Sequence, residues 1–204
     1  MSATIPSTVS GTVRPAVPAD VPHLLRLIRD LAVYEREPDA VKTTEAALEA
    51  SLFGEHPAVF CHVIEDTRPD DALAAGSATG PAGAEPIPER ASSALPRPSV
   101  VGLALWFLSY STWEGTHGIW LEDLYVDPAL RGRGHGTRLL SHLAGIAVER
   151  GYARLEWTVL DWNEPSIGFY RSLGATSQDE WTTFRLTGAA LEDAGAAAAS
   201  EGHR

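Results

Sequence analysis

The chain has 204 residues, of which 44% are hydrophobic and 21% charged, enough apolar material for one compact domain with a sizeable core. Its formal net charge of −11 would repel a phosphate backbone, so the composition disfavours nucleic-acid binding and suits a cationic small molecule. No apolar run approaches the roughly 20 residues that cross a bilayer, and the first residues lack the apolar centre of a secretory signal, so we expect a soluble cytoplasmic protein with no membrane partner.

Apolar periodicity predicts strands and helices that alternate along the chain. Apolar runs bounded by turn residues predict strands at residues 9–13, 58–64, 100–110, 118–126, 154–160 and 181–186. Helical spacing of apolar residues predicts helices after a cap at Asp20, at 44–52, at 136–150 with Gly151 as its end, and after a cap at Asn163. This order predicts a mixed α/β domain.

Three segments have a composition that does not support a core. Residues 1–9 resemble a flexible leader, and residues 189–204, with their alanine run, a flexible tail. Residues 66–99 are rich in Ala, Gly, Pro and Ser without apolar periodicity, which predicts a passive surface insertion. The folded domain is therefore expected over residues 10–188.

The single cysteine, Cys61, excludes an internal disulfide and indicates a reducing compartment. It lies in an apolar run, so we expect a small buried hydrophobe rather than a catalytic thiol. The histidines show no metal-ligand spacing, and no metal is expected.

A glycine-rich turn separates the strand at 118–126 from the helix at 136–150. Gly132, Gly134 and Gly136 allow backbone N–H groups to approach an anion, and the helix N-terminus adds a partial positive charge. Arg131 and Arg133 can add charge-assisted hydrogen bonds. The spacing differs from the dinucleotide fingerprint, and the Walker A lysine is missing. The segment therefore predicts a pyrophosphate site.

The pattern Arg131-x-x-Gly134-x-Gly136 after a strand resembles the acyl-CoA signature of the GNAT superfamily of N-acyltransferases. The segments 121–123 and 162–175 narrow the resemblance to the diamine (spermidine/spermine) and thialysine acetyltransferases, over about residues 12–188. The resemblance implies an α/β fold with a mixed, mostly antiparallel sheet, splayed central parallel strands and flanking helices. It also implies acetyl-CoA as co-substrate, a small cationic amine as acceptor, direct attack in a ternary complex, and a homodimer in which both chains shape the site.

The resemblance further implies which residues hold acetyl-CoA. Backbone groups of the strand would pair with the pantetheine arm, the turn would bind the diphosphate, and the helix that Asn163 caps would complete the site. The set is Leu124, Tyr125, Val126, Arg131, Gly132, Arg133, Gly134, His135, Gly136, Thr137, Asn163, Ser166 and Tyr170. We expect the His135 side chain to be an exposed spacer rather than a base.

Two residues match the catalytic positions of that family. A primary amine has a reference pKa of about 10.4 and must lose a proton before it attacks, and Glu122 matches the proposed base, acting through water. Tyr170 matches the general acid that protonates the departing thiolate. The alternatives are a solvated carboxylate and a packing tyrosine. Asp123 would add negative charge, but neighbouring strand residues face opposite ways, so both carboxylates face one pocket only with a bulge.

The amine itself would meet aromatic rings and carboxylates, which suit an ammonium group. The set that the resemblance implies is Tyr34, Glu35, Trp113, Glu122, Asp123, Glu156, Trp157 and Thr158. For Trp113 and Trp157 simple packing is the alternative.

Other functions stay open at this point. A protein lysine or N-terminal acetyltransferase would need an open groove for a peptide, and aminoglycosides are polycations too. A non-catalytic acyl-CoA-binding module is the alternative outside enzymes, although retention of Glu122 and Tyr170 speaks against it.

Overall fold

The computed structural model of the chain describes residues 11–66 and 99–201, which divide into two compact units between Thr158 and Val159. In the first unit five strands hydrogen-bond in sequence order. They are β1 (Thr12–Pro15), β2 (Phe60–Asp66), β3 (Ser99–Ser111), β4 (Thr116–Val126) and β5 (Leu155–Glu156). The first four are antiparallel and β5 runs parallel to β4. This confirms the predicted mixed, mostly antiparallel sheet.

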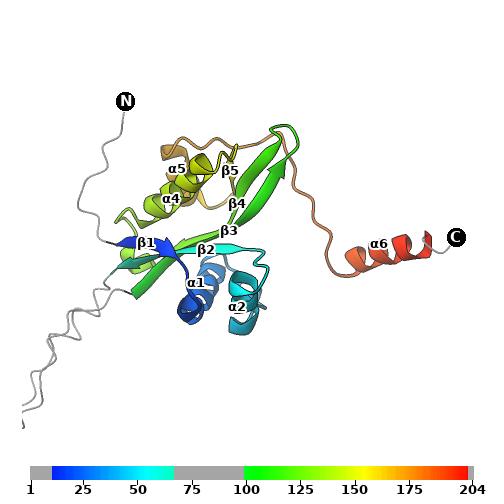
Figure 1. Cartoon of the computed structure of the whole chain (residues 1–204), viewed down its shortest axis with the longest axis horizontal. Helices are drawn as coiled ribbons and strands as arrows, with labels where there is room; N and C mark the ends of the chain where they lie inside the picture. Colours follow the sequence, from blue (N-terminus) through cyan, green and yellow to red (C-terminus); the bar gives the residue numbers. More distant parts are fainter. Residues whose placement is uncertain (1–10, 67–98, 202–204) are drawn as a thin grey trace, which may run out of the picture. The chain divides into compact units, whose positions relative to one another are not determined.

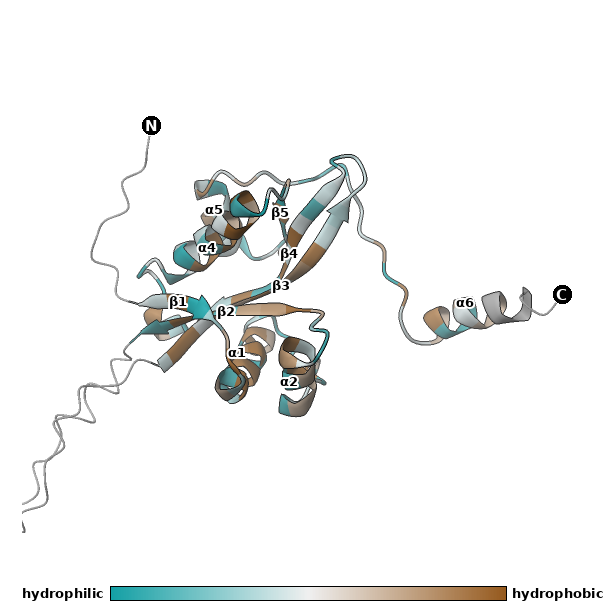
Figure 2. Cartoon of the chain, in the orientation of Figure 1, coloured by the Kyte–Doolittle hydropathy of each residue, from teal (hydrophilic) through white to brown (hydrophobic). Residues whose placement is uncertain are grey.

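Helices cover both faces of this sheet. Helices α1 (Val21–Tyr34) and α2 (Glu45–Phe53) lie on one face, and α4 (His135–Glu149) lies on the other (Figure 1). Short 3₁₀ helices, η1 (Pro18–Asp20) and η2 (Pro128–Leu130), precede α1 and α4. Figure 2 shows hydrophobic residues concentrated on α1, α2 and the central strands, as the periodicity predicts.

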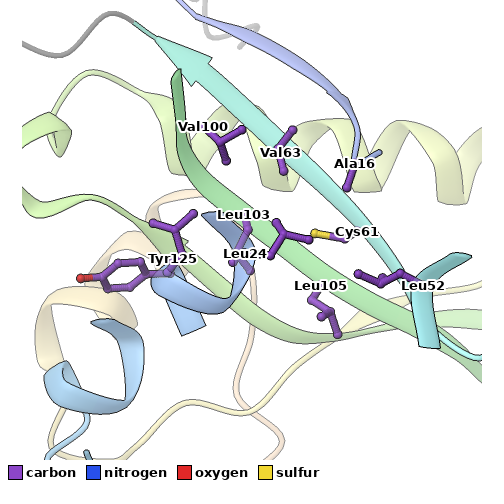
Figure 3. Packing of buried hydrophobic residues seen from close by; sticks show 10 residues of the cluster. Ala16, Leu24, Leu52, Cys61, Val63, Val100, Leu103, Leu105 and Tyr125 are labelled. Atoms are coloured by element: carbon purple, nitrogen blue, oxygen red, sulfur yellow. The ribbon is translucent and has the colours of Figure 1, made fainter. Parts of the chain in front are cut away.

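The core between α1 and the sheet is made of aliphatic side chains from several elements (Figure 3). Leu24 of α1 and Val63 and Leu103 of the sheet are fully buried, and each such side chain contributes about 1.5–3 kcal/mol. Cys61 lies in the same cluster, where burial and then the Asp123 carboxylate raise the pKa of its thiol to about 12. The thiol therefore stays protonated, and the prediction of a buried hydrophobe is confirmed.

Two helix ends carry local signals, of which the sequence analysis predicted the glycine after α4. The Thr44 hydroxyl accepts a hydrogen bond from the Ala47 N–H at 3.2 Å, as a side-chain cap of α2 should. Gly151, with φ of +67°, follows the last turn of α4 in the left-handed conformation.

The expected side-chain cap at Asp20 was wrong. Its carboxylate makes no cap bond to α1 and instead accepts from the Val17 N–H at 2.8 Å and from the Arg14 guanidinium at 2.6 and 2.9 Å. Arg14 also donates to Glu65 at 2.6 Å. A charged partner competes better for a carboxylate than a neutral N–H does, so Arg14 of β1 binds Asp20 of η1 and Glu65 of β2.

The second unit, residues 159–204, contains α5 (Glu164–Ser172) and α6 (Gly188–Glu201). Asn163 caps α5 as predicted, because its Oδ1 accepts from the Ser166 N–H at 3.3 Å. Most of the tail expected at 189–204 lies in α6, in agreement with the high helix propensity of alanine, and the flexibility of the tail stays a prediction. The unit boundary falls within the predicted domain 10–188.

Two strand predictions were wrong in part or whole. The strand expected at 154–160 is limited to β5, and residues 181–186 form no strand. Trp181 and Phe184 are 72% and 90% exposed. A strand exists only when a neighbour pairs with it, and no described strand pairs with this segment.

Parts of the sequence-based organisation lie outside the described residues: the leader at 1–9, and residues 67–98 of the insertion at 66–99. Within 11–66 and 99–201, no helix has the length and apolar character needed to cross a membrane.

Candidate active site

Strand β4 contains a β-bulge at the position of the two predicted carboxylates. Leu105 of β3 pairs with Asp123, but the next β3 residue, Trp106, pairs with Leu121, so Glu122 is one additional residue in β4. Side chains alternate along a strand, and an additional residue shifts that alternation. Glu122 and Asp123 therefore both point to the face of Leu105, which α1 covers. The bulge that the sequence required for both to face one pocket is present.

Three predicted carboxylates meet at this face. Burial, and then the neighbouring carboxylates of Glu122 and Glu35, raise the pKa of Asp123 to about 6. Burial also raises the pKa of Glu35. Like charges in a partly buried site disfavour ionisation of all members at once. The three groups thus form an electrostatically coupled acidic cluster that a cation would stabilise.

Trp120 belongs to this region, although the sequence analysis did not select it. Its indole Nε1 donates to Glu122 Oε2 at 3.0 Å. The two residues stand two apart in a strand and so share a face, a spacing that could have indicated the contact. The bond orients the Glu122 carboxylate.

The pairing between β4 and β5 is short. Ile119 pairs with Leu155 and Trp120 with Glu156, and no further pair between these strands occurs among the described residues. The parallel strands therefore part beyond Trp120, as the predicted splayed pair requires. Of the predicted amine-binding residues, Glu156 accepts from Arg154 Nε at 2.7 Å, and Trp157 and Thr158 follow β5.

The glycine turn has the backbone geometry of an anion site. Gly132 and Gly134 have φ of +78° and +79°, a conformation strained for a residue with a Cβ. The first hydrogen bond within α4 joins the Arg138 N–H to the Gly134 carbonyl at 3.0 Å. The N–H groups that precede this bond belong to His135, Gly136 and Thr137. They are the donors that a helix N-terminus offers to a phosphate.

Arg131 connects this turn to the end of α1. Its guanidinium carbon lies 4.8 Å from the centre of the Tyr34 ring and 5.2 Å from that of Tyr125. Its Nε donates to the Val126 carbonyl at 3.1 Å. Tyr34, predicted to bind the amine, thus packs on the turn, while the next residue, Glu35, belongs to the acidic cluster.

His135 is not the exposed spacer that the sequence suggested. Its ring is buried, and its Nε2 lies 2.9 Å from Asp66 Oδ2. Arg133 Nη1 lies 3.8 Å from the same oxygen. The sequence analysis missed Asp66 because it begins the low-complexity insertion, and no local pattern links residues 69 positions apart.

Trp113 lies away from the acidic cluster within its own chain. It sits in the turn between β3 and β4 and is 88% exposed. The stretch of β3 from Leu105, the partner of Asp123, to Ser111 spans about 20 Å at 3.3–3.4 Å per residue. One chain alone does not bring Trp113 to Asp123.

The remaining predicted residues belong to α5 in the second unit. Ser166 and Tyr170 are one turn apart and so lie on one face of this helix. Their role, with that of Asn163, towards the coenzyme and the leaving group stays a prediction.

The described part of the chain contains no group of three or more His, Cys, Asp or Glu residues that could hold a metal ion. The rings of His62 and His142 have their centres 4.6 Å apart. Burial, and then His142 and Arg150, lower the pKa of His62 to about 4, so its ring is neutral and accepts from Trp106 Nε1 at 3.1 Å.

Comparison with known proteins links this geometry to one family. Residues 94–175 match the acetyltransferase (GNAT) family. The chain is 38% identical over 184 residues to thialysine N-epsilon-acetyltransferase of Bos taurus, a match that covers 89% of this chain and 95% of that protein. It is 33% identical over 197 residues to an L-ornithine N5-acetyltransferase of Arabidopsis thaliana, covering 88% and 86%.

The fold is similar to a solved integron cassette protein from the mobile metagenome of V. cholerae. The TM-score is 0.64 at 23% identity, with 91% of this chain and 98% of that chain covered. The alignment with the bovine relative is 38% identical and covers 89% of this chain. The family match at residues 94–175 includes the bulged strand β4 and the glycine turn. The chain therefore belongs to the GNAT acetyltransferase family, whose enzymes use acetyl-CoA as co-substrate, and is an N-acetyltransferase.

Proposed function

We propose that the chain transfers the acetyl group of acetyl-CoA to a primary amine of a small cationic substrate, a diamine, a polyamine or a lysine-like amino acid. The observation that carries this proposal is the acidic cluster of Glu35, Glu122 and Asp123 on one face of the bulged strand. The two relatives named for thialysine and L-ornithine support the same substrate class, since both molecules are amino acids with a second amine.

The acidic cluster is suited to an ammonium group. Two unit charges 4 Å apart interact by about 4 kcal/mol at an effective dielectric constant of 20. An ammonium bound between the carboxylates would replace their mutual repulsion with attraction, and Asp123 would then ionise more readily. A second positive group on the substrate would bind the carboxylate of the cluster that the first ammonium leaves unpaired.

The coenzyme would bind along the C-terminal end of β4 and the N-terminus of α4. Its diphosphate would accept from the N–H groups of residues 135–137, where the helix dipole favours negative charge. Its pantetheine arm would pair with the edge of β4 at residues 124–126, beyond the last pair with β5. This placement would bring the thioester beside the bulge.

The chemistry would be a direct transfer in a ternary complex. Glu122 would take a proton from the ammonium through water, and the nitrogen lone pair would attack the thioester carbonyl carbon. The C–S bond would break, and the sulfur would take a proton from the Tyr170 hydroxyl. The nitrogen would lose its second proton to solvent, and solvent would return a proton to the tyrosinate, so that a neutral amide and a thiol leave. The Cys61 thiol does not serve as an acyl carrier, because it is buried and its raised pKa keeps it protonated.

Trp113 would reach an amine site only from a second copy of the chain. Within one chain it is highly exposed and roughly 20 Å along β3 from the level of Asp123. In a homodimer in which the β3–β4 turn of each copy enters the site of the other, the Trp113 ring would contact the amine bound in the partner's site.

An acetyl-CoA turnover screen of the full chain tests the proposed activity. We expect thiol release with spermidine, putrescine, ornithine or thialysine, each of which carries an amine and a second charged group. Turnover restricted to peptides or to aminoglycosides would contradict the substrate class. Calorimetry that detects no binding of CoA would contradict the enzyme assignment itself.

The pH dependence of amine binding tests the role of Asp123. Because the pKa of Asp123 is raised to about 6, its negative charge appears as pH rises through 6. We expect the KM for the amine to fall by about tenfold between pH 5 and 7, and Asp123→Asn to remove this change. Glu49→Gln, at an exposed position on α2, is the matched control and should keep the wild-type profile. An unchanged profile in Asp123→Asn would show that another group titrates.

Replacement of Tyr170 by phenylalanine tests the general acid. We expect kcat to fall by about 100-fold, the usual effect of losing one proton donor, while calorimetry shows unchanged CoA binding. Tyr152→Phe, which removes a hydroxyl just after α4, should leave kcat unchanged. Wild-type turnover in Tyr170→Phe would remove the assignment.

Mixed oligomers test the contribution of Trp113. We expect Trp113→Ala and the double variant Glu122→Gln/Asp123→Asn each to be weakly active, and their co-expression to restore activity, because a mixed dimer contains one intact site. Sedimentation should show a dimer. A monomer, or an activity equal to the sum of the two variants, would contradict a shared site.

A further inference from the structure

A buried hydrogen bond joins the glycine turn to the end of β2. His135 Nε2 and Asp66 Oδ2 are 2.9 Å apart, and the two side chains are 1% and 4% exposed. His135 is the first residue of α4, and Asp66 is the last residue of β2, where it pairs with Ser99. The proposed acetyl transfer assigns no role to Asp66 or to the imidazole.

The surrounding chain holds the imidazole in one orientation. A Cβ at Gly11 would come within 3.1 Å of His135 Cε1 and 3.4 Å of Nδ1, so Gly11, just before β1, packs against this side of the ring. The ring nitrogen Nδ1 is buried and has no hydrogen-bond partner in the part of the chain that the structure describes. The bond from Nε2 to Asp66 is therefore the polar contact that fixes the ring.

The glycine turn has few other means of holding its shape. Gly132 and Gly134 adopt left-handed conformations, and glycine loses more backbone freedom on ordering than any other residue. Gly134 is also the N-cap of α4 and provides no side-chain cap. An anion site made of backbone N–H groups binds well only if those groups are oriented before the anion arrives.

We propose that His135 and Asp66 are a positioning pair for the diphosphate of the coenzyme. The His135 backbone N–H is one of the donors of the turn, so a fixed side chain also fixes the direction of that donor and of the first turn of α4. Asp66 acts through His135 without touching the ligand. This inference rests on the proposed function, since it requires that the turn binds the diphosphate.

The pair should affect the coenzyme's diphosphate and not the acetyl-transfer step. The test compares acetyl-CoA with the acetyl thioester of N-acetylcysteamine, a donor without a diphosphate. For His135→Leu we expect the KM for acetyl-CoA to rise by about tenfold, the scale of one lost charge-assisted hydrogen bond. The kcat at saturating acetyl-CoA, the KM for the short donor and the KM for the amine should stay unchanged.

Conservative and double variants separate positioning from stability. His135→Gln keeps a donor near the position of Nε2, and Asp66→Asn keeps an acceptor, so both should bind acetyl-CoA as the wild type does. His135→Leu removes the imidazole that lies 2.9 Å from the buried Asp66 carboxylate and should lower Tm. Asp66→Leu/His135→Leu removes both polar groups, so Tm should recover while the KM for acetyl-CoA stays raised.

Two results would overturn the inference: a wild-type KM for acetyl-CoA in the double variant, or an equal loss of activity with both donors in His135→Leu. Either would show that the pair serves only folding. CoA binding by the wild-type chain is measured first. If the wild-type chain does not bind CoA, the proposed function is overturned, and the inference that rests on it is overturned too.

Discussion

Glu122 has no partner of its own in β3, and this single additional residue in β4 determines where the acidic groups of the protein point. In a regular strand, Glu122 and Asp123 would face opposite sides of the sheet. The bulge turns both towards the face that α1 covers, where Glu35 ends the helix. It also lies just beyond the last pair between β4 and β5, so the acidic cluster and the open strand edge occur at one place.

Placing these carboxylates together is electrostatically unfavourable, because like charges repel in a partly buried site. Burial, and then the neighbouring carboxylates of Glu122 and Glu35, raise the pKa of Asp123 to about 6, so its ionisation is less favourable than that of an ordinary aspartate. Asp20 is placed differently. It is as buried as the core residues, and against the effect of burial its hydrogen bonds to Arg14 hold its pKa below the ordinary value. The charged groups that shift the pKa of Asp123 are carboxylates, and a carboxyl group perturbed in this way is typical of a functional site.

The glycine turn is held from two sides. On one side Arg131 lies against the rings of Tyr34 and Tyr125, which connects the turn to the end of α1 and so to the acidic cluster. On the other side His135 is bound to the end of β2 through Asp66. Both contacts join the turn to rigid elements, which is the requirement for a backbone anion site with oriented donors. The binding roles that we assign to these residues remain predictions.

The sequence by itself determined the features that depend on neighbours along the chain: the helical periods, the cap at Asn163, the glycine after α4 and the glycine turn before it. Only the tertiary structure decided the bulge at Glu122, the burial of His135 against Asp66 and the absence of a strand at 181–186. The physical reason is the distance along the sequence over which each interaction forms. Helix turns and caps form between residues three or four apart, whereas strand register and buried polar pairs depend on segments that the fold brings together from distant positions.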